Sequence, residues 1–475
     1  MENKTLKYSS HLMAFILLIL ILSHLIITEK PSTTGSDPAV YVSWIQNHEN
    51  ILNKGKITSE RIHKILPVGI VLYSLKLLDQ PLSIANIHLF FEILDLLFII
   101  MASYTCYFIS NHLNISSRGR WLLFVAIFFN YGIMKYYMSV SILTDIMGYT
   151  IITLLVYFYI KNKTLALWIT TVIGTFCWAP LMYAGLILMA FPRLKYPLKQ
   201  VIPSFKLLTI PVALICGLIF LDIIKLTLGQ SKELNLNLVL SGLSTLLYIS
   251  FSSKELFRHE YFLKNSWSIL YSYRKSILLS GITFITIKVF IIYISHPGGF
   301  ALFDFFEQVL VDRSLVKPFG YFIDHVQFYG PLLILTVLLW RSISQITHQY
   351  GVGLIFFFLF SILFSLNTES RHSVHSFPIL AIFTVKALEN LKLRPYFYWI
   401  IMALGLFYSQ IWWGYGSIRF IGKEIDPIIS ALPSMGRYGW IPFLFPPIPY
   451  MVQSSMIIFL GILFYFMIRQ SRART

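Results

Sequence analysis

The feature that most constrains this chain is a series of apolar runs, each close to the length of a membrane-spanning helix. A helix needs about 20 mainly apolar residues to cross the hydrocarbon core, and runs such as Ile87–Ile109 and Met451–Ile468 approach or exceed that length. Only 12% of the residues are charged, against about 25% in soluble domains. We therefore expect an all-α membrane protein, and we exclude a soluble enzyme or a nucleic-acid-binding module.

The runs predict a polytopic transmembrane bundle of about 12–14 helices. The spans are expected at His11–Thr28, Ile87–Ile109, Arg120–Met138, Asp145–Ile160, Leu165–Phe191, Val201–Leu221, Leu238–Ser252, Ser276–Ser295, Gly330–Ser344, Gly351–Leu366, Ser373–Leu388, Pro395–Trp413 and Met451–Ile468. The fifth of these contains Pro180 and is expected to be a bent pair of short helices. No internal repeat is evident, so residues 1–475 are predicted to form a single membrane domain.

Basic residues are concentrated in the loops on one side of this predicted bundle. Just over half of the 38 Lys and Arg residues fall in the terminal segments and in every second loop between spans. By the positive-inside rule, that side is cytoplasmic and both termini lie there. Most acidic residues fall in the opposite, external loops. The external face is therefore where carboxylate chemistry is expected.

The first external loop, residues 29–86, contains the first candidate carboxylate, Asp37. Two interfacial helices are predicted in this loop. One is amphipathic, at Ala39–Asn50, with an apolar face of Val40, Trp44 and Ile45 that continues to Ile51 and Leu52, and the other is a shorter apolar helix at Ile65–Leu78. Asp37 would then lie at the boundary between water and lipid. A purely structural role is the alternative, because Asp37 precedes Pro38 as a helix N-cap would.

Asp145 is the second candidate carboxylate, at the start of a predicted span and at the same membrane level as Asp37. Lys135 lies a short distance before it in the sequence. Two carboxylates on one face can bind a divalent cation such as Mg²⁺ or Mn²⁺, or can position a hydroxyl group. Asp37 and Asp145 are therefore the expected metal ligands, if the protein uses a metal. The alternative is that Asp145 only caps its helix.

Two further external segments contain candidate binding residues. Between two apolar spans lie Arg371, whose planar guanidinium can hold a phosphate, and His372 and His375, which would share a face of a helix. Residues 296–328 form another external loop, in which His325 lies near the start of a span. For both segments, the alternative is a solvated turn without a function.

Three charged residues are predicted inside the membrane: Glu92, Asp95 and Lys288. Charges in spans usually face the bundle interior or a water-filled cavity. Glu92 and Asp95 are three residues apart and would share a helix face, either as a proton relay or as part of the wall of the external cavity. The sequence leaves their role open.

Several short motifs, all on the predicted external side, resemble those of the polytopic GT-C superfamily of glycosyltransferases, in its bacterial form. They are Gly35-Ser36-Asp37 with Tyr41, Lys54-Gly55-Lys56, Leu143-Thr144-Asp145, the kinked pair around Pro180, and Glu369-Ser370-Arg371 followed by Phe377-Pro378. The resemblance covers most of the chain as topology and only these motifs as sequence.

The resemblance implies an inverting transfer of a sugar from a polyprenyl-phosphate donor to a lipid, glycan or protein acceptor, at the outer face of a bacterial inner membrane. Carried over, Asp37 would be the catalytic base, Asp145 would bind metal or acceptor, and Arg371 with His372 or His375 would hold the phosphate. A lipid-linked oligosaccharide flippase or polymerase is one alternative. A proton-coupled transporter that uses Glu92, Asp95 and Lys288 is another.

Overall fold

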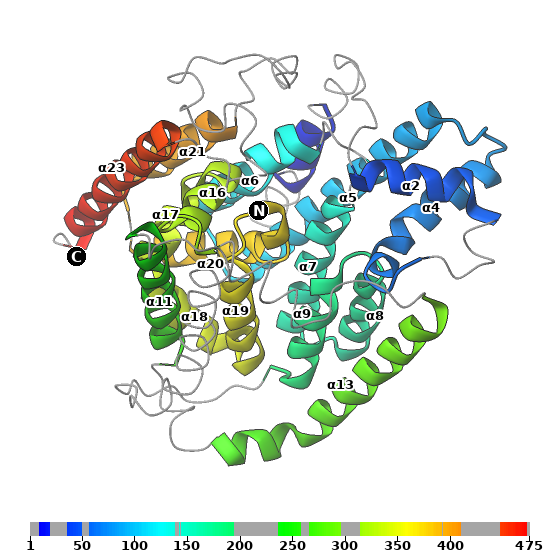
Figure 1. Cartoon of the computed structure of the whole chain (residues 1–475). Helices are drawn as coiled ribbons and strands as arrows, with labels where there is room; N and C mark the ends of the chain where they lie inside the picture. The colour runs from blue at the N-terminus through cyan, green and yellow to red at the C-terminus, as the bar shows by residue number, and fades with distance from the viewer. Residues whose placement is uncertain are drawn as a thin grey trace.

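The computed structural model of the chain is built from helices (Figure 1). It describes residues 9–19, 36–49, 57–137, 142, 144–193, 236–257, 266–295, 314–391, 393–409 and 447–472, and the structural statements below concern these ranges. No strand is formed within them. The expected span Val201–Leu221 and most of the external loop 296–328 lie outside the described residues.

After the N-terminal helix Ser9–Ile19, the described ranges contain a series of α-helices in chain order. They are α2 (Ser36–Gln46), α4 (Ile65–Leu77), α5 (Ile84–His112), α6 (Ser117–Phe128), α7 (Asp145–Ile160), α8 (Thr164–Thr175), α9 (Ala179–Ala190), α11 (Leu236–Leu256), α13 (Ser266–Ile294), α16 (Gly320–Tyr329), α17 (Leu332–Leu338), α18 (Trp340–Tyr350), α19 (Val352–Phe364), α20 (Phe377–Glu389), α21 (Pro395–Ser409) and α23 (Pro447–Arg472). Three short elements join them: the 3₁₀ helices η1 (Arg61–Lys64) and η4 (Ser370–Ser373), and the π-helical η2 (Gly132–Tyr137).

Four helical segments in the described ranges are long and apolar enough to cross a membrane: Ile84–His112, Leu236–Leu256, Tyr271–Ile294 and Tyr450–Gln470. Large apolar side chains on these segments remain exposed, for example Leu97 on α5 and Ile292 on α13. Such surfaces are unfavourable in water and suit contact with lipid. The structure thus agrees with an all-α protein that associates with membranes.

Several expected helices match the structure closely. The helix predicted at Asp145–Ile160 has the same bounds as α7, and the one predicted at Ile87–Ile109 lies within α5. The bent pair expected around Pro180 is also confirmed, as α8 and α9, with Pro180 in the first turn of α9. A proline is tolerated there because the first turn has no intrahelical partner for its missing N–H.

Two expected spans are interrupted. In place of one helix over Arg120–Met138, α6 ends at Phe128 and the π-helical η2 follows. The side chain of Asn130 accounts for the break: its Nδ2 donates to the carbonyl of Ile127 at 2.6 Å, and its Oδ1 accepts from the N–H of Ile133 at 3.0 Å. The span expected at Gly330–Ser344 is likewise split at Leu339, between α17 and α18.

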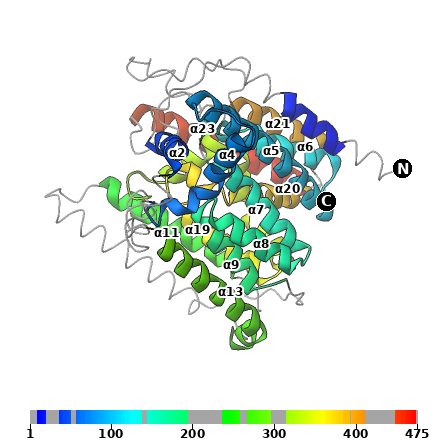
Figure 2. The ribbon, with the colours of Figure 1, turned by 90° about the vertical axis from the view of Figure 1, so that its right-hand side faces the viewer.

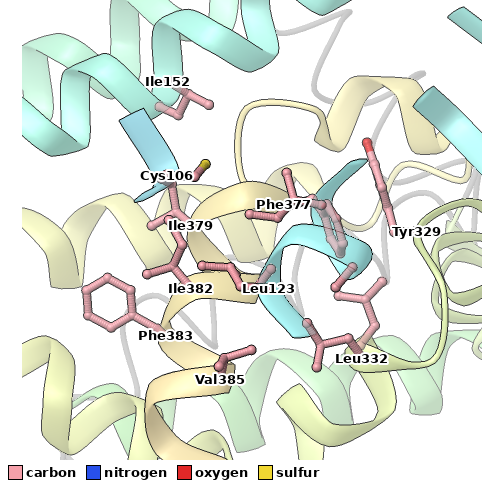
Figure 3. Packing of buried hydrophobic residues seen from close by; sticks show 14 of the residues in the cluster. Cys106, Leu123, Ile152, Tyr329, Leu332, Phe377, Ile379, Ile382, Phe383 and Val385 are labelled. Atoms are coloured by element: carbon pink, nitrogen blue, oxygen red, sulfur yellow. The ribbon is translucent and has the colours of Figure 1, made fainter. Parts of the chain in front are cut away.

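Helix α20 lies at the centre of the main hydrophobic core. Its apolar side chains point to different sides, with Ile379, Phe383 and Val385 all fully buried (Figure 3). A helix that is apolar around its whole circumference is normally enclosed by other helices. At its N-terminal end, the ring of Phe377 stacks on Tyr329 of α16, with centroids 4.2 Å apart and planes 12° apart.

A second core joins α2, α4 and α5, and both views show these helices together at one end of the structure (Figures 1 and 2). Tyr41 and Ile45 of α2 are buried against α4 residues such as Val71. The expected apolar face of this helix is confirmed in part: Ile45 is buried, whereas Val40 and Trp44 are only partly buried at its edge. This packing fixes the position of Asp37, in the first turn of α2.

Candidate functional site

Asp37 lies in the first turn of α2, one residue after the helix begins. Its carboxylate turns toward the rest of the protein, with Oδ2 3.4 Å from Nζ of Lys64 and 3.6 Å from Nη1 of Arg371. The role of a helix N-cap is therefore wrong for this residue: it lies inside the helix and its side chain pairs with two cations. These two partners are 27 and 334 residues away in the sequence, so tertiary packing brings them to Asp37.

Lys64 is the last residue of η1 and is held in place by its neighbours. His63 donates from Nδ1 to the carbonyl of Thr175, at 2.7 Å, and the N–H of Leu66 donates to the carbonyl of Phe176, at 3.0 Å. Burial lowers the pKa of His63 to about 4, so this imidazole is neutral at pH 7. These bonds tie η1 to the end of α8 and direct the ammonium of Lys64 at Asp37.

The third segment of the site is η4, in the polar connection between α19 and α20. Glu369 precedes it, and its Oε2 lies 3.2 Å from Nε of Arg371 and 3.4 Å from Nε2 of His372. Asn367 supports this turn: its Oδ1 accepts from the N–H of Glu369 at 2.8 Å, and its Nδ2 donates to Nδ1 of His372. Because Nδ1 of His372 accepts, the proton of the neutral imidazole lies on Nε2 and faces Glu369.

Aromatic contacts complete a closed ring of residues, which we call the charge ring. The ammonium of Lys64 lies 5.5 Å from the ring centroid of Trp178, just before α9, and Trp178 in turn packs edge-on against His372 at 6.1 Å. The members of the charge ring, in order of contact, are Asp37, Lys64, Trp178, His372, Glu369 and Arg371. Its charged side chains are 14–25% exposed, so they are shielded but accessible.

The two cations control the ionisation of Asp37. Burial alone would raise its pKa, but Lys64 and Arg371 outweigh burial and lower the pKa below its usual value. For Lys64, burial acts to lower the pKa, and the neighbouring Tyr41 and Asp37 more than compensate, so the pKa lies above its usual value. Asp37 is therefore a carboxylate, and Lys64 is an ammonium, at pH 7.

Asp145 lies beside the charge ring at the start of α7, where it is 1% exposed. Arg371, Lys64 and Asp37 are its main electrostatic neighbours. The expected capping role is not observed, since Thr144 occupies the cap position without a side-chain bond. Among the described residues, Oδ1 of Asp145 has no hydrogen-bond partner. An orphaned carboxylate oxygen next to ionised groups is a natural acceptor for a substrate hydroxyl.

The other predicted binding residues lie elsewhere. His375 is fully buried between the rings of Phe360 and Phe364, and its Nδ1 donates to the carbonyl of His372. The two histidines do not share a helix face, because η4 ends at Ser373, before His375. Thus His372 belongs to the charge ring and His375 does not.

His325 lies behind η4 and not in the site. Its Nε2 donates to the carbonyl of Ser365 at 2.8 Å, and its Nδ1 accepts from Oγ of Ser370 at 2.9 Å. Burial lowers its pKa to about 4. His325 thus supports the turn that carries Arg371. Lys135 falls in η2, and its side chain lies outside the described residues.

The charged residues predicted inside the membrane do not form a single group. Asp95 lies within electrostatic range of Asp145 and Glu92, on the side of α5 that faces α7. Lys288 of α13 lies instead near the rings of Tyr183 and Phe284, 6.0 Å from each centroid. In the described ranges, no carboxylate lies within ion-pair distance of Lys288. The acids thus lie near Asp145, whereas Lys288 lies within electrostatic range of His63, the residue before Lys64.

An apolar groove lies along α4, the helix that follows Lys64 in the sequence. It has a volume of about 660 Å³ and is lined by one side of α4 together with the end of α8 and of α13. Its lining residues are Ile65, Leu66, Gly69, Ile70, Tyr73, Ser74, Leu77, Phe176, Phe290 and Ile294. The two residues that follow Lys64 in the sequence are thus the first residues of the groove. The charge ring and the groove thus share the chain segment from Lys64 to Leu66, with the charged side chain on the ring and the two apolar side chains in the groove. A polar site followed by an apolar groove suits an amphipathic ligand.

The donor set fits an anion better than the divalent cation expected at Asp37 and Asp145. The oxygen of Asp37 that would bind a metal is already opposed by Lys64 and Arg371, which would repel a cation. No group of three or more His, Cys, Asp and Glu side chains with metal-site geometry occurs in the part of the chain that the structure describes. The residues around Asp37 thus suit the binding of an anion, and no role is assigned to a metal ion at this site.

The sequence predicted four residues of this region: Asp37, Asp145, Arg371 and His372. It did not indicate Lys64 or Trp178, and it assigned no role to Glu369. The available signal for Lys64 was a lone cation at the start of an apolar segment, which is typical of many membrane-surface residues. Trp178 had no polar signal at all. In comparisons with known proteins, no family model, curated protein or solved structure matches this chain.

Proposed function

We propose that the protein is a polytopic membrane glycosyltransferase, similar to the GT-C superfamily, that moves a sugar from a polyprenyl-phosphate donor to a hydroxyl group of an acceptor. The observation that carries the proposal is the charge ring beside the apolar groove. Asp37, Lys64 and Arg371 come from three distant segments and meet at Lys64, the residue that precedes the groove residues Ile65 and Leu66 in the sequence. A base, an anion-binding pair of cations and a channel for a lipid tail are thereby combined in one place.

In this proposal, Lys64 and Arg371 bind the phosphate of the donor. Both cations are oriented by contacts outside the pair, Lys64 through the bonds of His63 and Leu66, and Arg371 through Glu369. In the structure they face Asp37, and the incoming phosphate takes over these contacts. The two positive charges then stabilise the negative charge that develops on the phosphate as the sugar leaves.

Asp37 acts as the base once the phosphate has drawn the two cations away. The oxygen of the acceptor hydroxyl attacks the anomeric carbon from the face opposite the phosphate. A new C–O bond forms, the bond from the anomeric carbon to the phosphate oxygen breaks with its electron pair, and the hydroxyl proton passes to Asp37. One displacement of this kind inverts the anomeric configuration. Asp145, whose Oδ1 has no hydrogen-bond partner among the residues that the structure describes, orients the acceptor.

The prenyl chain of the donor occupies the groove along α4. One face of this helix, including Leu66, Gly69 and Tyr73, is turned into the groove, whose walls are almost entirely apolar. A chain of isoprene units gains about 25 cal/mol for each Å² of apolar surface that it removes from water. The proposal places the site at the external side of a bacterial inner membrane, with both termini cytoplasmic, as the distribution of basic residues predicts.

The proposal can be tested with the purified protein in phospholipid vesicles. A radiolabelled sugar on a prenyl phosphate is supplied with a mixture of membrane lipids and glycans as acceptors, and a sugar nucleotide is supplied in a parallel sample. We expect label to reach the acceptor from the prenyl-phosphate donor only, with inverted anomeric configuration. Transfer from the sugar nucleotide alone, or donor movement across the bilayer without transfer, would contradict the proposal and would favour another enzyme class or a flippase.

A further inference from the structure

Glu369 is the second acid of the charge ring, beside Asp37. Its carboxylate contacts Arg371 and His372. Its backbone is fixed on both sides: its N–H donates to Oδ1 of Asn367 at 2.8 Å, and its carbonyl accepts from the N–H of His372 at 2.9 Å. Its carboxylate is 14% exposed. The fixed backbone and the low exposure restrict the movement of this carboxylate. Its role is therefore expected to be the orientation of the side chains that it contacts.

The main neighbour is Arg371, whose guanidinium is divided between two carboxylates. Nε lies 3.2 Å from Oε2 of Glu369, and Nη1 lies 3.6 Å from Oδ2 of Asp37. The shorter contact is to Glu369. The planar guanidinium can therefore pivot little, and its Nη1 edge remains directed at the position that Asp37 now occupies.

We propose that Glu369 is a positioning residue for the transfer: it holds the Nε side of Arg371 so that Nη1 is available to the donor phosphate and Asp37 is not bound too tightly. The inference rests on the proposed function and adds a role for this acid. Without the charge of Glu369, Arg371 would be attracted more strongly toward Asp37 and Asp145. The phosphate would then compete with a stronger ion pair, and Asp37 would accept a proton less readily.

His372 is placed to support the same function. It contacts the same oxygen of Glu369 through Nε2, and its other face packs on Trp178, which also contacts Lys64. The contact adds a second partner to Oε2 of Glu369, the oxygen that also faces Nε of Arg371. Arg371 and, when it is protonated, His372 are thus charged groups that contact Glu369 directly.

The test is the transfer assay with Glu369→Gln and Glu369→Asp, with Glu49→Gln as a matched control. Glu49 is an exposed acid in the same predicted external face and lies outside the charge ring. For Glu369→Gln, we expect the donor KM to rise about tenfold while kcat changes less than about threefold, as for loss of a group that aims a binding residue. The acid limb of kcat/KM should also move to lower pH, because Asp37 is paired more strongly.

Glu369→Asp retains the charge and should recover part of both effects, whereas Glu49→Gln should resemble the unaltered protein. The position of the acid limb does not depend on the amount of folded protein, so a less stable variant still gives a clear answer. Normal transfer with an unchanged KM and acid limb in Glu369→Gln would overturn this inference and leave the proposed function intact. Absence of transfer by the unaltered protein would overturn the proposed function and this inference with it.

Discussion

The two sides of η4 carry similar polar groups in opposite surroundings. On one side, Glu369 and Arg371 are partly exposed, ionised and shared with Asp37. On the other side, Ser370 is fully buried, its Oγ bonded to His325, and Tyr329 donates to its carbonyl at 2.7 Å. Access to solvent and the presence of paired charges thus distinguish the candidate site from its scaffold. Polarity by itself does not.

A clear division of roles follows from this difference. Charged residues whose opposite charges are shared can exchange partners when an anion arrives, at little cost. Neutral groups that are buried and fully bonded cannot, because each lost bond leaves a desolvated partner. Substitutions in the charge ring should therefore change activity and binding, and substitutions behind η4 should change stability.

The largest effect is expected for Asp37→Asn. Asparagine has nearly the same shape but cannot take the proton of the acceptor, so transfer should fall by about 10²–10⁴-fold, the usual contribution of a general base. Asp79→Asn is the matched control, because Asp79 is exposed and has a positive φ of 49° that asparagine also tolerates. Initial rates in vesicles measure the effect. A rate for Asp37→Asn equal to that of the control would remove Asp37 as the base.

Lys64→Gln should have the next largest effect, on binding. Loss of one partner of a shielded charge pair costs about 2–5 kcal/mol, so farnesyl phosphate should bind about a hundredfold more weakly. Lys76→Gln removes the same charge from an exposed position at the end of α4 and should bind normally. Titration of the detergent-solubilised protein compares the two. Equal affinity in both variants would show that the cation of the charge ring does not bind the phosphate.

Gly69→Trp should block the groove. An added Cβ at Gly69 meets no atom within 4 Å, so the indole can extend into the groove without disturbing α4. The donor KM should rise about tenfold, which corresponds to about 1.4 kcal/mol of lost binding. Gly281→Trp on α13 also meets no atom within 4 Å and lies outside the groove. If both variants use long-chain donors equally well, the prenyl chain binds elsewhere.

The smallest effect on function is expected behind η4. His325→Phe removes the hydrogen bonds of His325 to Ser365, Ser370 and Ser373 and should destabilise the protein by about 1–3 kcal/mol while the donor KM is unchanged. Burial lowers the pKa of His325 to about 4, from an ordinary value of 6.5. Between those pH values the unfolded chain binds the extra proton, so stability falls as the pH drops from about 6.5 to 4. Thermal unfolding in detergent should show a weaker pH dependence for His325→Phe.

Much of the fold could be predicted from the sequence because apolar periodicity and length determine helices in a membrane protein. The bounds of α7 and the bent pair at Pro180 are examples. The break at Asn130 could not be predicted, because it depends on side-chain bonds to the local backbone that compete with helix formation. The number of membrane-crossing helices stays a prediction.

The candidate site was predictable only in part. Asp37, Asp145 and Arg371 were recognisable as polar groups at the same expected membrane level, and the structure brings them together. Sequence could not tell His372 from His375 or identify Lys64, because burial and contact between distant segments decide these cases. His375 is enclosed by phenylalanine rings, whereas His372, three residues earlier, faces Glu369.

The central step of the proposed mechanism is that the donor phosphate replaces Asp37 at Lys64 and Arg371. The most direct test is the affinity of Asp37→Asn for farnesyl phosphate, measured at pH 7 beside the unaltered protein and Asp79→Asn. We predict that Asp37→Asn binds farnesyl phosphate several-fold more tightly, because the competing carboxylate is gone. Weaker binding by Asp37→Asn, with normal binding by the control, would show that the carboxylate helps to hold the ligand and would contradict the exchange of partners.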